Sequence, residues 1–260
     1  MDASISPAAL QRSLASANPP VVLDVRRRER FLESPSMIAG ALRRDPDAVD
    51  AWKDDLPARA GIVVYCVHGH EVSQNAARAL GARYLEGGIE AWKAAGGALD
   101  AKPAGAATRW VTRERPKIDR IACPWLVHRF IDADAEFLYV PPAQVKVVAS
   151  ARHAAPYDIP DVAFSHEGER CSFDAFLRHY RLEADPALCE LALIVRGADT
   201  DRLELAPQAA GLAAISLGLS SLCRDDAAML EHGMTIYDAL YAWCGGARSE
   251  RHTWNPAALR

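Results

Sequence analysis

One cysteine and two histidines lie where a strand-like run meets a helical pattern. Cys66 ends the β-branched run of VVYCVHGHEVSQNAARAL, residues 63–80, and His68 and His70 follow it. Three interpretations are open: Cys66 is a nucleophile, a metal ligand together with both histidines, or a small apolar side chain at a strand end. Three donors this close in sequence, without an evident fourth, make a poor tetrahedral metal cage.

The elements around Cys66 favour a nucleophile. A loop that runs from a parallel strand into a helix N-terminus turns its N–H groups inward, and the helix adds a partial positive charge that stabilises a thiolate. Gly69 lets the backbone curl around the sulfur, and Ser73 is placed to cap the helical pattern that Gly81 ends. The residues expected to form this substrate loop are Val67, His68, Gly69, His70, Glu71, Val72 and Ser73.

Residues 1–97 predict an α/β domain with a parallel sheet. The short apolar runs at residues 21–25 and 62–66 are typical of strands that are buried on both faces. Helical patterns at residues 5–14 and 72–81 alternate with these runs, as they do in βαβ units.

The second half of the chain differs from the first in composition and in its expected secondary structure. Residues 98–109 are rich in Gly, Ala and Pro without an amphipathic period, and they predict a linker. In residues 110–246, strand-like runs at 136–140 and 145–149 precede several helical patterns, which predicts an α+β, mostly helical domain. The polar tail at residues 247–260 is expected to be loosely held.

Composition argues against several classes of protein. Half of the residues are hydrophobic, a quarter are charged and the net charge is -4, which argues against a general nucleic-acid-binding protein. The longest apolar run, residues 205–223, contains proline, glutamine and serine, so it predicts a buried core helix and not a membrane span. Widely spaced cysteines without a CxxC pair, and no secretory pattern near Met1, indicate reduced thiols in a cytoplasmic protein.

Four ordered motifs resemble those of the rhodanese (sulfurtransferase) family. They are LDVRRRERF at residues 23–31, MIAGA at 37–41, YCVHGHEVSQNAARAL at 65–80 and LEGGIEAWKAAG at 85–96. The resemblance implies that the Cys66 thiolate takes a sulfane sulfur from a small-molecule donor such as thiosulfate and becomes a persulfide, which passes the sulfur to an acceptor thiol or cyanide. This cycle requires no cofactor. The resemblance also implies that Asp24 organises the domain near the loop; its alternative role is that of a structural partner of Arg26.

Three departures from the rhodanese pattern bear on the substrate. Met37 stands where the family usually has a histidine. The loop carries two histidines and a glutamate where many thiosulfate-active members have arginine or lysine, so thiosulfate is expected to be a poor substrate. The loop is also one residue longer than the commonest spacing, which leaves oxyanion reduction as an alternative. Phosphatases and arsenate reductases on this fold, however, carry an arginine where this chain has Val72 or Ser73.

A basic strip opens the second half, and a helix is expected to begin within it near Lys117. One interpretation is a solvated edge whose cations make weak surface ion pairs. The other is an anion site in which guanidinium groups hold a tetrahedral dianion beside a thiol. The candidates for this anion site are Arg113, Lys117, Arg120 and Cys123.

A second polar cluster lies in residues 153–171. Its His, Asp, Glu and Cys side chains suit zinc, iron or manganese, and Asp158 and His166 are the best candidates for ligands of a metal in the C-terminal domain. The alternative is that these side chains are turn and capping groups. Arg196 and Asp199 could join the same region, as an ion pair or otherwise.

Most of residues 110–244 resembles the C-terminal domain of the ChrB family of chromate-resistance proteins. The motifs that carry the resemblance are TRERPKIDRIACPWLVHRFID, DIPDVAFSHEGERCSFDAF, IVRGADT and LAPQAAGLAAISLGLS. The resemblance implies a role in surviving chromate, a tetrahedral dianion that thiols can reduce, as a sensor, regulator or reductase. A non-enzymatic sensor of chromate or of another oxyanion is therefore the alternative to a sulfurtransferase.

Overall fold

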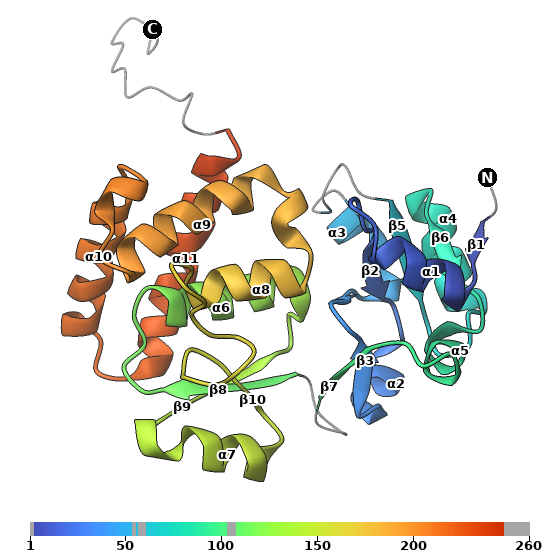
Figure 1. Cartoon of the computed structure of the whole chain (residues 1–260), viewed down its shortest axis with the longest axis horizontal. Helices are drawn as coiled ribbons and strands as arrows, with labels where there is room; N and C mark the ends of the chain where they lie inside the picture. Colours follow the sequence, from blue (N-terminus) through green and yellow to red (C-terminus); the bar gives the residue numbers. More distant parts are fainter. Residues whose placement is uncertain (1–2, 54–55, 57–60, 103–107, 247–260) are drawn as a thin grey trace, which may run out of the picture.

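A five-stranded parallel sheet forms the centre of the N-terminal domain (Figure 1). The computed structural model describes residues 3–53, 56, 61–102 and 108–246. Across the sheet the strands are β1 (Ser4–Ile5), β6 (Arg83–Leu85), β5 (Ile62–Tyr65), β2 (Val21–Asp24) and β4 (Leu42–Arg43). β2 is buried along its whole length because separate apolar cores lie on the two faces of the sheet. The predicted α/β domain with a parallel sheet is confirmed.

Short helices cover both faces of this sheet. They are α1 (Pro7–Leu14), α2 (Arg28–Glu33), the 3-10 turn η1 (Pro46–Ala48), α3 (Val49–Trp52), α4 (Glu71–Leu80) and α5 (Gly88–Ala94). Gly81 ends α4 in a left-handed conformation, as predicted, with φ of +62°. The predicted cap of α4 is wrong: His70 occupies the N-cap position, so Ser73 lies inside the first turn and is buried there.

A two-stranded antiparallel sheet lies beside the main sheet. It pairs β3 (Ser36–Ile38) with β7 (Leu99–Ala101). The prediction of an irregular linker over 98–109 is therefore wrong at β7, because pairing with β3 supplies the backbone hydrogen bonds that a composition rich in Gly and Ala does not predict. Residues 103–107 lie outside the described residues.

The C-terminal domain combines a small parallel sheet with a larger helical part, which confirms the predicted α+β, mostly helical class. The strands, in the order β10-β8-β9, are β10 (Ala155–Pro156), β8 (Arg109–Arg113) and β9 (Glu136–Val140). The helices are α6 (Asp119–Leu126), α7 (Val145–Arg152), α8 (Ser172–His179), α9 (Pro186–Asp199), α10 (Ala209–Leu222) and α11 (Asp226–Cys244). Shorter turns are η3 (Val127–Ile131), η4 (Pro142–Gln144), η5 (Leu182–Ala184) and η6 (Leu203–Leu205).

The strand predicted at residues 145–149 is in fact the first part of α7. Its β-branched residues suggested a strand, but Val145 and Ala149 are the buried positions, one helical turn apart. They pack in a small apolar core with Val111 of β8. Packing on one helical face thus outweighs the strand preference of the β-branched side chains.

Helix α6 contains Pro124 in its interior and continues directly into the π-helical turn η3. Proline has no N–H, so the carbonyl of Arg120, four residues earlier, loses its usual helical partner. The hydroxyls of Tyr139 and Tyr157 donate to this carbonyl instead, each at 3.3 Å. The helix therefore passes through the proline because one tyrosine on β9 and one directly after β10 supply the missing donors.

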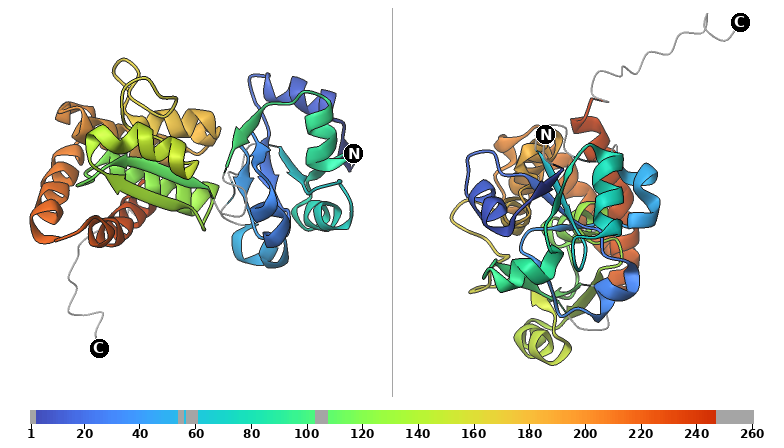
Figure 2. Two further views of the ribbon diagram at one scale, coloured as in Figure 1. Left: turned by 90° about the horizontal axis from the view of Figure 1, so that it is seen from below. Right: turned by 90° about the vertical axis from the view of Figure 1, so that its right-hand side faces the viewer.

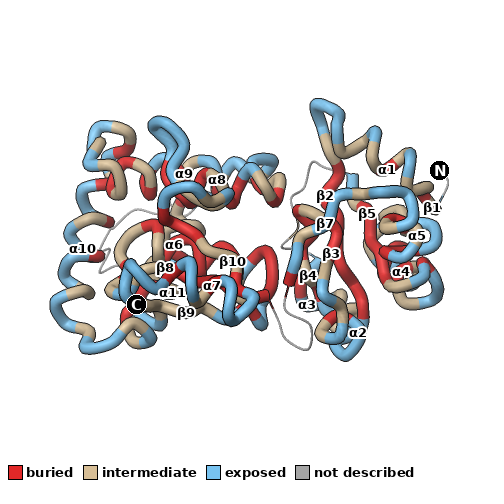
Figure 3. Tube along the Cα trace, turned by 60° about the horizontal axis from the view of Figure 1, so that its bottom comes forward, coloured by how far each residue is buried: buried red, intermediate tan, exposed pale blue. Residues whose placement is uncertain are grey.

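Helix α10 is less buried than its apolar sequence predicts. Only Ala209, Leu212 and Ser216 are buried along it, whereas Ile215 and Leu217 are about half exposed. Figure 3 shows the helix at the edge of the C-terminal domain, largely exposed or half-buried, so the predicted buried core helix is wrong. In the described part of the chain, no helix combines the length and the apolar character that crossing a bilayer requires.

The two domains lie side by side and contact each other (Figure 2). His179 Nε2 in the C-terminal domain pairs with Asp100 Oδ2 of β7 at 2.9 Å. The Arg44 guanidinium, after β4, donates to the carbonyl of Phe130 at 2.8 Å. One cluster of buried apolar side chains also includes members of both domains.

Candidate functional site

Cys66 stands directly after β5 and four residues before the N-cap of α4. Its side chain is nearly enclosed, with 7% of the residue exposed. The loop residues Val67, His68, Gly69 and His70 connect the strand to the helix, with Gly69 at a φ of +71°. The structure thus places Cys66 at the carboxyl end of a central parallel strand, where open α/β sheets bind ligands.

The start of α5, which follows Gly87, holds the backbone of Cys66 and Val67 in place. The N–H of Ile89 donates to the carbonyl of Cys66 at 3.0 Å, and the N–H of Glu90 donates to that of Val67 at 3.3 Å. Gly88 has a φ of +58°, and a Cβ atom there would lie 2.4 Å from both of these carbonyl oxygens. Residue 88 must therefore be a glycine for two reasons: its backbone is left-handed, and the two carbonyl oxygens leave no room for a Cβ atom.

We expect Gly88→Ala to distort the loop and to lower sulfur transfer, because alanine would collide with the carbonyls of Cys66 and Val67. The left-handed backbone alone would cost about 1–2 kcal/mol in free energy of unfolding. Gly81→Ala is the matched control: Gly81 has a similar φ of +62°, but nothing lies within 4 Å of its Cβ position. Urea unfolding and activity of both variants check this; equal effects of the two would contradict the supporting role of Gly88.

Ser73 makes the side-chain contact to the sulfur that the sequence did not predict. Its Oγ lies 3.1 Å from Cys66 Sγ and 3.2 Å from the carbonyl oxygen of His70. The hydroxyl has one proton, so it donates either to this carbonyl, while its oxygen accepts from the Cys66 thiol, or to a Cys66 thiolate. The first turn of α4 adds its partial positive charge. The only sequence signal was a small polar residue in the first turn of a helix that follows the cysteine.

Within the part of the chain that the structure describes, His68 and His70 do not form a metal site with Cys66. His68 and His70 are exposed, with ring centroids 5.9 Å apart. Among the described residues, both groups of three or more side chains that could hold a metal ion lie in the C-terminal domain. Glu71 is exposed and Val72 half-buried on the first turn of α4, so the loop offers the sulfur no cationic side chain.

Asp24 ends β2 and is buried in an ion pair with Arg26. Arg26 Nη2 lies 2.5 Å from Asp24 Oδ2, and the Tyr65 hydroxyl donates to the same oxygen at 2.8 Å. Arg26 also donates to the carbonyl of Ser36 at 3.1 Å. These contacts join β2, β3 and β5 at Tyr65, the residue that precedes Cys66. They are the contacts expected if Asp24 is a structural partner of Arg26.

The four candidates for an anion site do not meet around an open pocket. The guanidinium groups of Arg113 and Arg120 lie 2.6 Å and 3.2 Å from Asp158 Oδ2. Cys123 is fully buried, and burial raises the pKa of its thiol well above the ordinary value. Lys117 lies in the turn before α6. The thiol therefore cannot face a bound oxidant beside the arginines, because apolar packing encloses it.

Asp158 and His166, the two candidate metal ligands, do meet in the structure. His166 Nε2 lies 3.4 Å from Asp158 Oδ1. Two further carboxylates, Asp119 and Asp199, contact the same imidazole. Contacts with Asp119, Asp158 and Asp199 raise the pKa of His166 to about 12, and burial raises the pKa of Asp119 to about 7. For Asp158, burial opposes ionisation, but His166 and Arg113 outweigh it and its pKa is lowered.

Sequence reasoning missed Asp119 as a member of this group and left the role of Asp199 open. Asp119 stands within the basic strip, for which a solvated edge with weak surface ion pairs was one interpretation. Arg196 pairs with Asp174 in the structure, at 2.5 Å. The backbone is unusual at the residue before Asp119. Ile118 has a φ of +43°, which is rare for a β-branched residue. The Ile118 N–H donates to Ser216 Oγ at 3.0 Å, which helps to hold this conformation.

Two families match the chain, one for each domain. Residues 6–95 match the rhodanese-like domain, and residues 110–244 match the ChrB C-terminal domain. The curated Protein ChrB of Cupriavidus metallidurans is 32% identical over 133 residues, which make up 51% of this chain. These residues span 40% of that relative's length.

Solved structures of rhodanese-like proteins match little more than a third of the chain. A rhodanese-related protein from Thermoplasma volcanium is 24% identical, and the match covers 37% of this chain and 96% of that one, with a TM-score of 0.33. A rhodanese-like domain protein from Staphylococcus aureus is 23% identical, with 38% and 98% covered and a TM-score of 0.32. The match to the ChrB C-terminal domain includes more than half of the 260 residues, and the chain therefore belongs to the ChrB family, with a rhodanese-like domain preceding the ChrB domain.

Proposed function

We propose that the protein is a rhodanese-type sulfurtransferase that carries sulfur as a persulfide on Cys66. The observation that supports this most directly is the position of Cys66 Sγ at the end of β5, 3.1 Å from Ser73 Oγ. The thiol stands beside the first turn of α4, and the N-terminal turn of a helix carries a partial positive charge. A loop held by glycines encloses it, as a covalent sulfur carrier requires.

The proposed cycle has two displacement steps. In the first, the Cys66 thiolate attacks the outer sulfur of the donor; with thiosulfate, the S–S bond of the donor breaks and sulfite leaves with the electron pair. In the second, an acceptor thiolate or cyanide attacks the outer sulfur of the persulfide. The S–S bond to Cys66 then breaks, and its electron pair restores the thiolate. Atoms and charges balance in both steps without a cofactor.

We further propose that the enzyme prefers donors of low charge. The segment after Cys66 carries His68, His70 and Glu71 and no arginine or lysine before α4 is under way. Imidazoles beside a carboxylate attract a dianion more weakly than the guanidinium or ammonium groups of arginine or lysine would. The anion therefore depends on backbone N–H groups alone, which suit a monoanionic thiosulfonate or an organic persulfide better than thiosulfate.

We expect kcat/KM for the monoanion methanethiosulfonate to exceed that for thiosulfate by about 10-fold or more. We also expect His68→Arg to raise kcat/KM for thiosulfate by about 10-fold and to make it fall with added salt. Arg78→Lys on α4 is a control that leaves the loop charge unchanged. Steady-state assays with both donors check this; a thiosulfate rate that His68→Arg does not change would contradict the proposed donor preference.

Membership of the ChrB family supports a role in the response to chromate. Chromate oxidises thiols, and we propose that sulfur carried on Cys66 serves thiol acceptors under this stress. A reducing compartment such as the cytoplasm would keep Cys66 in the thiol form that the cycle needs, and none of the six cysteines forms a disulfide. Direct chromate binding by Arg113 and Arg120 is less favoured, because both guanidinium groups already contact Asp158.

A further inference from the structure

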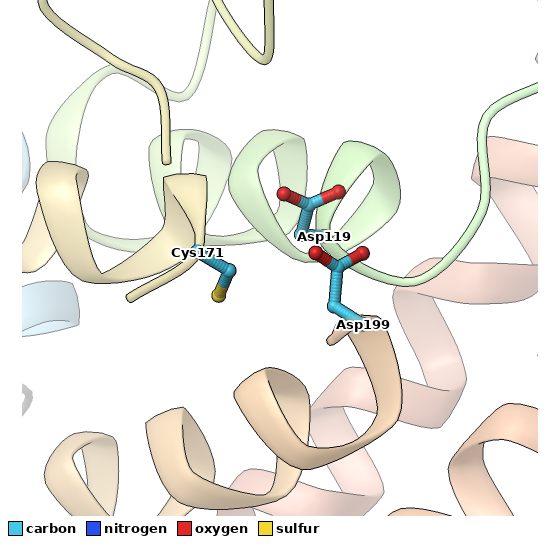
Figure 4. A group of neighbouring side chains, drawn as sticks. All are labelled: Asp119, Cys171 and Asp199. Carbon is cyan, nitrogen blue, oxygen red and sulfur yellow. The ribbon is translucent and has the colours of Figure 1, made fainter. Parts of the chain in front are cut away.

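Side chains from three segments of the C-terminal domain meet at the start of α6. Asp119 is the first residue of α6 and Asp199 the last residue of α9, and Figure 4 shows their carboxylates side by side. Asp158 and His166 come from the segment between β10 and α8. We call these four residues the Asp119 cluster.

The imidazole of His166 lies at the centre of the Asp119 cluster. Its Nε2 atom is 3.1 Å from Asp199 Oδ2 and 3.4 Å from Asp158 Oδ1. It is 3.5 Å from Asp119 Oδ2. One imidazole nitrogen can donate one hydrogen bond, so it cannot satisfy three carboxylates at once.

One oxygen of the cluster is buried without a hydrogen-bond donor. Asp119 is 2% exposed, and its Oδ2 atom has no hydrogen-bond partner among the described residues. His166 Nε2 at 3.5 Å is beyond the usual range for such a bond. A buried carboxylate oxygen without a partner is destabilising, and a cation in front of Asp119 would remove this penalty.

We propose that the Asp119 cluster binds a divalent first-row transition metal ion. Ligand atoms about 2.0–2.2 Å from a metal at the centre of a tetrahedron are about 3.3–3.6 Å apart. The separations of 3.1 Å, 3.4 Å and 3.5 Å around His166 Nε2 are close to this spacing. Ligand atoms of Asp119, Asp158 and His166 all lie within 4.8 Å of one another, and Asp199 joins them through its contact with His166 Nε2. Carboxylate and imidazole donors suit manganese, iron or zinc.

Outer contacts orient Asp158 toward this site. Arg113 and Arg120 both bind its Oδ2 atom, at 2.6 Å and 3.2 Å, which leaves Oδ1 facing His166. The hydroxyl of Ser172 donates to Oδ1 at 3.1 Å. Such outer contacts fix the direction of a metal ligand. Two arginines also offset the net negative charge that three carboxylates retain around a divalent ion.

The site has an access route and a sulfur neighbour. The His166 side chain is 41% exposed, so an ion can enter from that side, where water or a substrate could complete the coordination. Cys171 offers an Sγ atom within 4.8 Å of ligand atoms of Asp119 and Asp199. Its thiol faces Asp174 Oδ2 at 3.6 Å, and we place it outside the set of direct ligands.

The test uses the full-length protein, stripped with a chelator and titrated with MnCl2 while the electron paramagnetic resonance signal of free Mn²⁺ is recorded. Calorimetry with ZnCl2 follows. Mn²⁺ is informative because thiols such as Cys66 bind it weakly. We expect one equivalent of Mn²⁺ to bind, and Asp119→Asn and His166→Gln each to weaken binding by about 100-fold or more.

Asp161→Asn is the matched control, since Asp161 lies in the same segment with its side chain 88% exposed and contacts Lys146 instead. It should bind Mn²⁺ like the wild type. Asp119→Asn keeps the size of the side chain, and His166 is half exposed, so both variants should keep the native circular dichroism spectrum. The proposal is overturned if the wild type binds neither metal saturably, or if both variants bind as tightly as the wild type. This test does not depend on the chemistry of Cys66.

Discussion

Replacing Cys66 by alanine is expected to lower kcat/KM for sulfur transfer by about 1,000-fold or more. The variant has no thiolate at the end of β5, so no persulfide can form in the loop. The measurement is thiocyanate production from methanethiosulfonate and cyanide. No other thiol stands in the N-terminal domain to replace Cys66: Cys123, Cys171 and Cys244 are buried in the C-terminal domain, and half-buried Cys223 and exposed Cys189 also belong to that domain.

Cys189→Ala is the matched control for this experiment. Cys189 is the exposed cysteine, on α9 and far from β5 in sequence, and its removal should leave the rate unchanged. If Cys66→Ala keeps a rate within about 10-fold of the wild type, sulfur transfer does not proceed through Cys66 and the proposed function fails.

The free energy of unfolding of the N-terminal domain is expected to fall by about 3–5 kcal/mol in Asp24→Ala. The substitution leaves the Arg26 guanidinium buried without its counter-ion, since both side chains are at most 1% exposed. The Tyr65 hydroxyl also loses its acceptor. Urea unfolding followed by tryptophan fluorescence measures the change, because Trp52 and Trp92 belong to this domain.

Glu33→Ala is the control for burial. Glu33 forms an ion pair with Arg30 on α2, at 3.0 Å, but both side chains are more than 60% exposed. Solvent screens such a pair, so the change should stay within about 0.5 kcal/mol. A loss below about 1 kcal/mol in Asp24→Ala would mean that the buried pair is not what holds β2, β3 and β5 together.

The sequence predicted the N-terminal domain well because its signals are local. Apolar runs of strand length mark β2 and β5, and Gly81 marks the end of α4. The contact between Ser73 and Cys66 was not predictable, because it depends on how the loop turns between strand and helix. β7 was missed for a similar reason: a distant strand, β3, provides its hydrogen bonds.

In the C-terminal domain, tertiary contacts outweigh local patterns. Val145 and Ala149 pack on one helical face, so α7 forms where β-branched residues predicted a strand. Pro124 remains inside α6 because tyrosines of other segments bind the carbonyl that it leaves free. Cys123 falls on the buried face of the same helix, which removes it from the predicted anion site.

The candidate metal ligands show the same limit. Asp158 and His166 were predicted from one polar segment, and the structure brings them together. Asp119 and Asp199 lie about 80 residues apart, and only the packing of α6 against α9 brings their carboxylates to one place. One sequence carries no signal for this proximity.

Mass spectrometry of the peptide that contains Cys66 detects directly whether this residue carries sulfur. The wild-type protein is reduced, freed of small thiols, incubated anaerobically with methanethiosulfonate, alkylated and digested. We predict that the peptide containing Cys66 gains the mass of one sulfur atom, that cyanide removes this sulfur, and that Cys189 gains none. A Cys66 peptide without added sulfur, in protein that still transfers sulfur to cyanide, would show that Cys66 is not the sulfur carrier.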